Sequence, residues 1–249
     1  VFYWAGMLAF NPLKTWWCRL TQRSIPEVQP WWRWAAVAAW TLLSLLWLGA
    51  DRLLRDGDEE GHVGAAELFL SDLSQTDFSG FLERLLVGPM GEYPQFFAAA
   101  VGAWWWGTGV GDPSQLAVRS VCLLSLPVAA IATGRIAARL TPDDRNSAEC
   151  WATVLVLTIP LANGLTRHFM PEGALIAVTA VTVLCAMRWA DYPSAGRTIQ
   201  LGVVLGVGML TKQTFVLAAA APVAWVLRDR LKSDFLRILA VIAVAVAVA

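Results

Sequence analysis

The sequence predicts an all-α protein, a polytopic transmembrane helical bundle, and three observations lead to this prediction. Of the 249 residues, 57% are hydrophobic and only 15% are charged, which is more apolar surface than one soluble core of this length requires. Uncharged runs approach the roughly 20 residues that cross a bilayer core as a helix, and they recur along the chain. Tryptophans gather at the ends of several of these runs, as in the aromatic belts of membrane interfaces, and they are Trp16, Trp17, Trp31, Trp32, Trp34, Trp104 to Trp106 and Trp189.

Six or seven membrane segments are expected from the order of these runs. Residues 1–33 form a cytoplasmic or interfacial amino-terminal segment, and residues 34–249 form the transmembrane domain, with an external loop at 51–92. The uncharged runs are 34–50, 93–111, 120–134, 150–166, 173–187, 198–227 and 238–249. Lys212 alone interrupts the sixth run. Because the chain begins with valine and stops inside an apolar run, we expect it to be the amino-terminal part of a longer protein.

Lysine and arginine predict how these segments are oriented. Four basic residues outnumber a single acid in the amino-terminal flank, which places this flank in the cytoplasm; they are Lys14, Arg19, Arg23 and Arg33. Residues 51–92 hold ten acids and three arginines, and would lie outside. The basic loops 135–145 and 228–237 also belong to the cytoplasmic side. Two full crossings between residues 92 and 135 would place the basic loop 135–145 outside. We therefore expect the helix starting at Tyr93 to be tilted or re-entrant.

One segment of the external loop has the pattern of an amphipathic helix. Its apolar residues recur at helical spacing on one face, and they are Phe78, Phe81, Leu82, Leu85 and Leu86. Such a helix lies in the membrane interface or packs against the membrane domain, and the sequence leaves both open.

Charge and cysteine content exclude other classes of function. The net charge is zero and no basic stretch is interleaved with aromatic residues, so a nucleic-acid partner is not expected. Four widely spaced cysteines form no metal or redox pattern, and they are Cys18, Cys122, Cys150 and Cys185. We expect them to be small buried side chains.

The densest acidic cluster, residues 56–60, lies a few residues beyond the first membrane run. Asp58 and Glu59 would stand at the level of the lipid headgroups, where a fixed carboxylate can accept a proton from an attacking hydroxyl. A solvated acidic loop explains the same cluster. Further along, Glu92 and Tyr93 precede Pro94 at a predicted helix start, which the proline and the helix dipole explain without a functional role.

A second helix entrance, residues 167–172, carries Arg167 and Glu172. Arg167 could hold a phosphate oxygen bidentately, although an arginine at the interface does not need that role. The helix dipole explains Glu172 as well as a functional role does. His168 between them is expected to be an interface residue rather than a ligand.

Lys212 is the most informative single position. It lies about fourteen residues from either end of an uncharged run, too deep for its ammonium group to reach the headgroups from a straight spanning helix. We therefore expect the helix to break at residues 210–212, which would bring Lys212 to the outer side. There it could neutralise a departing phosphate. Gly202, Gly206 and Gly208 before it suit close helix packing.

In their order, these motifs resemble the glycosyltransferases of the GT-C fold that are related to protein O-mannosyltransferases and to the bacterial lipid A aminoarabinose transferase. That superfamily has an Asp-Glu pair after its first membrane helix and a Tyr-Pro or Lys-Pro-Pro element opening the second. An arginine followed shortly by an acid comes after the fourth hydrophobic run, and a Gly-rich helix ends in Leu-Thr-Lys. The resemblance covers residues 34–227, with matches at 58–59, 92–94, 167–172 and 202–212.

The resemblance implies a membrane glycosyltransferase of the cell envelope, mannosyltransferase-like, that takes a sugar from a polyprenyl-phosphate donor with inversion. Asp58 looks like the catalytic carboxylate, with Glu59 beside it and Asp56 as the alternative if the alignment slips by two. Glu172 looks like a second acid near the acceptor or a metal, and Lys212 like a contact to the carrier phosphate. No cofactor is certain, and relatives differ in whether they need a divalent metal.

The sequence departs from the superfamily pattern in two places. Glu92-Tyr93-Pro94-Gln95 stands where some relatives have a lysine before two prolines, so a second phosphate-binding lysine is absent, and Glu172 stands where aspartate is usual, which adds a methylene group to the site. The implied partners are the donor, the bilayer and a lipid, glycan or protein acceptor. The implied location is the bacterial inner membrane, multi-pass, with the active site on the extracytoplasmic side. A polytopic transporter or lipid flippase is the alternative, since charges inside broken helices also serve transport. A non-catalytic membrane scaffold would leave Lys212 unexplained.

Overall fold

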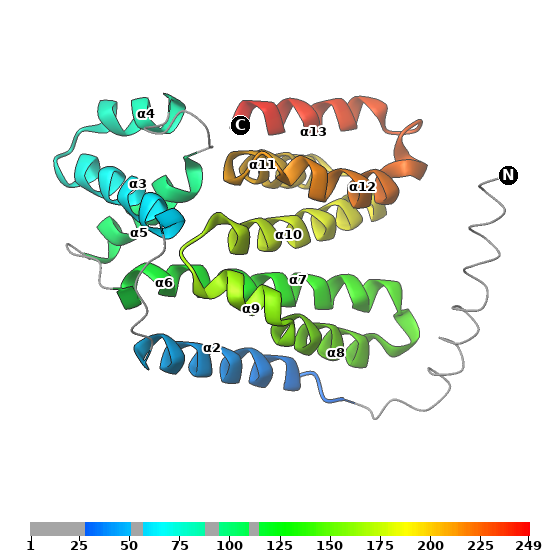
Figure 1. The fold of residues 1–249 in the computed structure, drawn as a ribbon. Coiled ribbons are helices and arrows are strands. Elements are labelled where there is room, and N and C mark those ends of the chain that lie inside the picture. The colour runs from blue at the N-terminus through cyan, green and yellow to red at the C-terminus, as the bar shows by residue number, and fades with distance from the viewer. Residues whose placement is uncertain (1–27, 51–56, 88–94, 110–114) are drawn as a thin grey trace, which may run out of the picture.

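In a computed structural model the chain forms a bundle in which the long helices run side by side (Figure 1). The structure describes residues 28–50, 57–87, 95–109 and 115–249, apart from the side chains of residues 58, 86, 87 and 115–118. Every regular element in these ranges is helical, which confirms the predicted all-α fold. In chain order the elements are α2 (Trp32–Ala50), α3 (Gly57–Ser74), α4 (Phe78–Val87), α5 (Phe96–Thr108), α6 (Gln115–Leu123), α7 (Ser125–Leu140), η1 (Pro142–Asp144), α8 (Arg145–Thr158), α9 (Pro160–Arg167), α10 (Pro171–Asp191), α11 (Ala195–Thr211), α12 (Phe215–Leu227), η2 (Arg228–Arg230) and α13 (Phe235–Val248).

Three helical segments are long and apolar enough to cross a membrane: α2, the stretch Arg119–Leu140 that combines α6 with α7, and α10. The pair α8–α9 is a fourth candidate if its two parts, bent by 61°, count as one broken span. Helices α11 and α13 are apolar but have only 17 and 14 residues. The described ranges thus contain three or four candidate spans where the sequence predicts six or seven, because helix ends divide several of the uncharged runs.

The break between α8 and α9 is produced by proline. Pro160 is the first residue of α9, and Ile159 before it has an extended backbone, as the residue before a proline prefers. The side chain of Asn163 compensates the main-chain groups that the break releases. Its Nδ2 donates to the carbonyl oxygens of Leu157 at 2.7 Å and of Ile159 at 2.9 Å. The bend is therefore a hydrogen-bonded feature inside an apolar bundle.

The predicted interruption of the sixth run is confirmed. Helix α11 ends at Thr211, Lys212 has an extended backbone, and α12 begins at Phe215. Two glycines of α11 face α13 closely, whereas Gly208 lies against the ring of Phe215. A Cβ atom at Gly202 would lie 2.9 Å from a carbonyl oxygen of α13, and one at Gly206 would lie 2.7 Å from another. Both positions therefore need glycine for the two backbones to approach this far.

Ion pairs gather the basic loops at one end of the bundle. Arg33 at the start of α2 and Arg135 near the end of α7 both approach Glu149 of α8, each at 2.6 Å. Arg139, also of α7, pairs with Asp191 at the end of α10. Figure 1 shows the start of α2, the turn between α7 and α8, and the turn between α12 and α13 at this same end.

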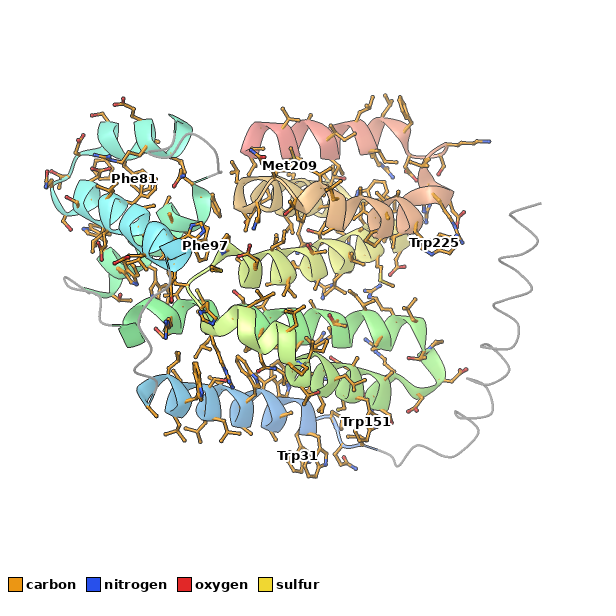
Figure 2. The ribbon with its side chains drawn as sticks, viewed as in Figure 1. Trp31, Phe81, Phe97, Trp151, Met209 and Trp225 are labelled. Atoms are coloured by element: carbon orange, nitrogen blue, oxygen red, sulfur yellow. The ribbon has the colours of Figure 1, made fainter. Side chains whose placement is uncertain are left out.

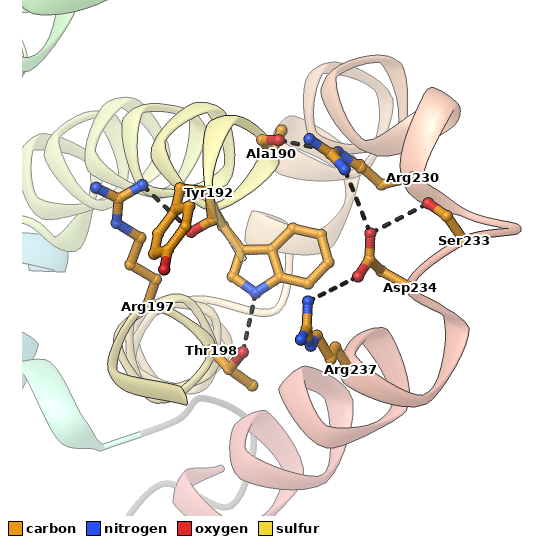
Figure 3. A network of polar contacts seen from close by, with 9 residues as sticks. Ala190, Tyr192, Arg197, Thr198, Arg230, Ser233, Asp234 and Arg237 are labelled. Carbon is orange, nitrogen blue, oxygen red and sulfur yellow. Dashed lines mark hydrogen bonds and ion pairs between the residues drawn. The ribbon is translucent and has the colours of Figure 1, made fainter. Parts of the chain in front are cut away.

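A second polar network closes the same end across α10, η2 and α13 (Figure 3). Arg230 donates from Nε to the carbonyl oxygen of Ala190 at 2.9 Å. Asp234 accepts from Arg237 at 2.9 Å and lies 3.6 Å from Arg230. The basic stretches that the sequence assigns to one side of the membrane thus lie together; they are the stretches around Arg33, Arg135–Arg145 and Arg228–Arg237. We call this the basic end.

Five of the described tryptophans of the predicted belt are exposed, and Figure 2 shows one of them, Trp31, at the margin of the bundle; they are Trp31, Trp32, Trp34, Trp104 and Trp106. The prediction is wrong for Trp105 and Trp189, which are fully buried. Trp189 donates from Nε1 to Thr198 Oγ1 at 3.0 Å. Trp16 and Trp17 lie outside the described residues. The expected burial of the cysteines is confirmed for Cys122, Cys150 and Cys185, which are free, and Cys18 is not described.

Helices α3, α4 and α5 form a separate layer beside the ends of the long helices (Figure 1). Its core is made of apolar side chains of α3 and α5, among them Val63, Phe69 and Trp105. The amphipathic face predicted for α4 is divided between two environments. Phe81 and Leu85 pack against this core, whereas Phe78 and Leu82 are exposed. At 13 residues, α5 is shorter than the segment predicted to start at Tyr93 and is too short to span a bilayer as a straight helix.

Candidate functional site

The site is built around a short link, His168–Met170, that joins α9 to α10. His168 and Met170 have extended backbones, and Pro171 starts α10 in the first-turn position where its missing N–H is not needed. The ring of Phe169 is completely buried, with its centroid 5.2 Å from that of Phe97 and 5.8 Å from that of Trp105. The aromatic side chains of α5 thus fix the middle of the link.

A buried ion pair between Glu59 of α3 and Arg119 of α6 lies against this link. Arg119 donates from Nε to Glu59 Oε1 at 2.6 Å and from Nη2 to Oε2 at 2.8 Å, the bidentate geometry that arginine forms with a carboxylate. The main-chain N–H of Phe169 donates to the same Oε1 at 3.0 Å. Glu59 is 0% exposed and Arg119 is 2% exposed. One carboxylate therefore connects α3, α6 and the link.

The environment of Glu59 decides its charge. Burial by itself raises the pKa of this carboxyl group. This effect is outweighed by the hydrogen bonds from Arg119 and from the Phe169 N–H, together with the charge of Arg119. The pKa therefore stays below its ordinary value of 4.5. His168 Nδ1 lies 3.9 Å from Oε2 and acts in the same direction when protonated. An ionised, enclosed carboxylate whose two oxygens accept hydrogen bonds is suited to holding the surrounding chain in place.

A second ion pair joins the start of α10 to the break after α11. Lys212 Nζ pairs with Glu172 Oε1, and these side chains are 20% and 29% exposed. Glu172 lies in the first turn of α10, where the helix dipole favours a negative charge. Lys212 directly follows the last residue of α11, so its ammonium group reaches Glu172 from the break between two helices and not from the middle of a helix. The predicted residues Glu172 and Lys212 are thus brought together, although 40 positions separate them.

The two ion pairs belong to one end of the bundle, opposite the basic end. Glu59 binds the N–H of Phe169, and Glu172 follows that residue by three positions. The link therefore connects the Glu59–Arg119 pair to the Glu172–Lys212 pair through a few bonds of main chain. We call the region of these four residues, with Arg167, the polar end.

Arg167, the last residue of α9, reaches the polar end from another direction. The carbon at the centre of its guanidinium group lies 4.6 Å from the ring centroid of Trp47, in the last turn of α2. Its Nε is buried and has no hydrogen-bond partner among the described residues. No carboxylate in the described part of the chain forms an ion pair with it, in contrast to Arg119 and Lys212. The guanidinium group of Arg167 thus retains its capacity to bind an anion.

The remaining predicted site residues are placed only in part. Asp58 lies in the first turn of α3, directly before Glu59, but its side chain is outside the described set. Glu92 and Tyr93, predicted to bind substrate, lie outside the described residues altogether. The roles assigned to all seven predicted residues remain predictions.

Sequence reasoning missed Arg119 and Trp47. Arg119 stands at the edge of the uncharged run 120–134, where a basic residue is expected as an ordinary flank. The available signal was its position in an apolar helix, because a cation there needs a partner, and the acids after the first membrane run supply one. Trp47 resembles the other interfacial tryptophans, and no feature of the sequence distinguishes it.

An apolar cavity of about 400 Å³ opens between α5, α7, α10 and α11. It extends from Thr211, next to Lys212, along α10 from Ala174, two residues after Glu172. Ser125 and Thr211 are the hydroxyl-bearing residues of a lining that is otherwise apolar; the other lining residues are Phe96, Phe97, Ala100, Leu124, Val128, Ala174, Ala177, Val178, Val181, Val204 and Val207. The cavity can hold hydrocarbon beside a charged pair.

Within the described ranges, no three histidine, cysteine or acidic residues gather in a way that could hold a metal ion. A family model described as dolichyl-phosphate-mannose-protein mannosyltransferase matches residues 99–249. The match includes Arg119, Arg167, Glu172 and Lys212, and it begins after the acidic cluster of α3. No curated protein and no solved structure is significantly similar to the chain.

Proposed function

Because the chain belongs to the dolichyl-phosphate-mannose-protein mannosyltransferase family, a family of membrane glycosyltransferases, we propose that it transfers a sugar from a polyprenyl-phosphate donor to a hydroxyl-bearing acceptor with inversion. The acceptor is a lipid, a glycan or a protein. The observation that carries the proposal is the polar end itself. The link His168–Met170 joins three features: the buried carboxylate of Glu59, which follows Asp58; the Glu172–Lys212 pair; and Arg167, which has no carboxylate partner among the described residues.

In the proposed reaction, the acceptor oxygen bonds to the anomeric carbon from the face opposite the phosphate. The bond from that carbon to the phosphate oxygen breaks, and its electron pair leaves with the polyprenyl phosphate. Asp58 takes the proton from the acceptor hydroxyl as the new bond forms. Glu59 is less suited to this step, because Arg119 and the Phe169 N–H already bind its oxygens. Its role in the proposal is to fix the first turn of α3, and with it Asp58.

Positive groups at the polar end would stabilise the departing phosphate. Arg167 offers several N–H donors in one plane, which match phosphate oxygens. Lys212 adds a point charge that it shares with Glu172. Preorganised cations of this kind are most effective where charge develops in the transition state. If a divalent cation takes part, Glu172 and Asp58 are the acids we expect to bind it.

The apolar cavity next to Lys212 supports a lipid-linked donor. An isoprenoid chain is hydrocarbon, and its burial beside α10 and α11 would place the attached phosphate near the Glu172–Lys212 pair. A soluble nucleotide-sugar donor would have no use for such a lining. The cavity thus favours a lipid carrier over a water-soluble one.

The positive-inside rule orients the proposed site. The basic end would face the cytoplasm, so the polar end would face the extracytoplasmic side of the bacterial inner membrane. Single cysteines introduced at positions 58 and 212 should then react with a membrane-impermeant thiol reagent from outside, whereas a cysteine at position 139 should not. Labelling of positions 58 and 212 from opposite sides would refute a shared site.

The decisive experiment measures transfer of a labelled sugar from a polyprenyl-phosphate donor by the full-length protein. We expect Asp58→Asn to lose at least 100-fold in kcat, on the order of what general-base catalysis contributes. Glu60→Gln is the matched control, since Glu60 is an exposed acid two residues further along α3. Equal activity of Asp58→Asn and the wild type would refute the role of Asp58. Translocation of the lipid across vesicles without sugar transfer would instead support a flippase.

A further inference from the structure

Arg167 contacts the aromatic ring of Trp47, whereas Arg119 and Lys212 at the polar end each pair with a carboxylate. We propose that Trp47 is a positioning residue that holds the Arg167 guanidinium group in the orientation in which it binds the phosphate of the lipid-linked donor. This inference rests on the proposed function. It assigns the orientation of a phosphate-binding arginine to a tryptophan of the first membrane helix, 120 positions away in the sequence.

The charges at this end favour Arg167 as the main anion-binding group. The charge of Arg119 is neutralised by Glu59, and that of Lys212 is shared with Glu172. Arg167 has the face of an indole ring at 4.6 Å in place of a carboxylate. A cation over an aromatic face is held by the ring quadrupole without loss of its charge, and the N–H groups of a guanidinium lie in its own plane. Trp47 can therefore fix Arg167 and leave donors free for phosphate oxygens.

A second contact between the same two helices makes the orientation specific. Trp40 donates from Nε1 to Asn163 Oδ1 at 2.6 Å, one turn of α9 before Arg167. Asn163 in turn binds the carbonyl groups released by the bend at Pro160. Trp40 and Trp47 are seven residues apart on α2, and Asn163 and Arg167 are four apart on α9, so each pair lies on one helical face. Together the two contacts fix the rotation of α9 relative to α2.

The two tryptophans have different functions in this arrangement. Trp40 is partly buried and packs against the apolar core between α7, α8 and α9, so it stabilises the bend. Trp47 is 36% exposed and contributes little to that core. Loss of the Trp47 ring should therefore change the binding of an anion more than the stability of the fold.

The experiment uses the full-length protein and two measurements: donor KM and kcat in sugar transfer, and the Kd for polyprenyl phosphate alone. We expect Trp47→Leu to weaken polyprenyl phosphate binding by about 3- to 5-fold and to lower kcat/KM for the donor by at least the same factor, as loss of one partly exposed cation–π contact implies. Trp47→Phe keeps an aromatic face and should recover most of the affinity. Trp32→Leu removes an exposed indole from the opposite end of α2 and should have no effect.

A double-mutant cycle with Arg167→Met separates positioning from general destabilisation. If Trp47 acts through Arg167, then Trp47→Leu should cause no further loss of affinity in the Arg167→Met background. Equal additional losses in both backgrounds would overturn the inference, even if Trp47→Leu also lowers the melting temperature. If Trp47→Leu binds polyprenyl phosphate as the wild type does while Arg167→Met binds it more weakly, the positioning role of Trp47 is refuted and the phosphate-binding role of Arg167 is not. Failure of the proposed function would appear separately, as the absence of sugar transfer by the wild type.

Discussion

Replacement of Arg119 by methionine should destabilise the protein in a way that depends on pH. The substitution removes two of the hydrogen bonds that Glu59 accepts and leaves a carboxylate that is 0% exposed next to an apolar side chain. Breaking one side of a buried ion pair costs about 3–5 kcal/mol, because the remaining charge is uncompensated. The buried carboxyl group can escape this penalty by taking up a proton.

The cost of that protonation sets the size of the effect. A carboxyl group with an ordinary pKa of 4.5 takes up a proton at pH 7.5 at a cost of about 4 kcal/mol, since each pH unit corresponds to about 1.36 kcal/mol. At pH 5.5 the same step costs about 1.4 kcal/mol. The difference in unfolding free energy between wild type and Arg119→Met should therefore decrease by up to about 2.7 kcal/mol between pH 7.5 and pH 5.5.

The sign of this effect differs between the two proteins. In the wild type, the pKa of Glu59 is lowered on folding, so its contribution to stability is present above pH 4.5 and is lost as the pH falls through the folded-state pKa. In Arg119→Met, burial dominates and raises the pKa, so stability falls as the pH rises above 4.5. Between pH 5.5 and 7.5, Glu59 should leave the wild type unchanged and make the variant less stable.

Unfolding of the purified protein in detergent, followed by circular dichroism at both pH values, measures this difference. The double variant Arg119→Met, Glu59→Gln should recover part of the stability and lose the pH dependence, because it has no buried charge to protonate. Arg139→Met is the control, since its pair with Asp191 is at the surface and should contribute at most about 1 kcal/mol. A difference between wild type and Arg119→Met that stays constant with pH would refute the reasoning.

Three other predictions test the fold around the site. Lys212→Met and Glu172→Gln should each reduce sugar transfer, and a double-mutant cycle of unfolding should give a coupling of about 1 kcal/mol, whereas additive effects would contradict the ion pair. Asn163→Leu should destabilise the protein by about 1–3 kcal/mol in denaturant unfolding, because it leaves carbonyl groups at the bend without donors; an unchanged midpoint would show that other donors replace it. Gly206→Ala should lower the melting temperature, since its Cβ would lie 2.7 Å from a carbonyl oxygen of α13. Gly196→Ala, whose Cβ would have nothing within 4 Å, should be neutral or stabilising. The same change in melting temperature at both positions would argue against close packing.

Features set by local sequence were predicted correctly. The helical fold and the break at Lys212 follow from one physical constraint, since a bilayer tolerates neither unpaired backbone groups nor an isolated ammonium group at its centre. The common location of the basic stretches follows from the charge bias that the bilayer imposes. None of these predictions requires knowledge of which helices are neighbours.

The candidate site depends on that knowledge, and much of it was not predictable. Glu59 and Arg119 are 60 positions apart, and no spacing rule connects an acidic cluster with an arginine at the edge of another run. The amphipathic pattern of α4 indicated one apolar face but not that Phe81 would be covered while Phe78 remained exposed. Trp189 lies at the end of an apolar run, as the interfacial tryptophans do, but it packs in a core that α11, α12 and α13 complete.

The hydrogen bond from the link to Glu59 comes from the main chain of Phe169, not from its side chain. Any residue except proline supplies the same N–H, so this hydrogen bond between the link and α3 does not itself depend on the side chain at position 169. Relatives could therefore exchange the aromatic ring there, and reshape the surrounding packing, while this attachment persists. Variation at this position would be a poor guide to whether the architecture of the site has been retained.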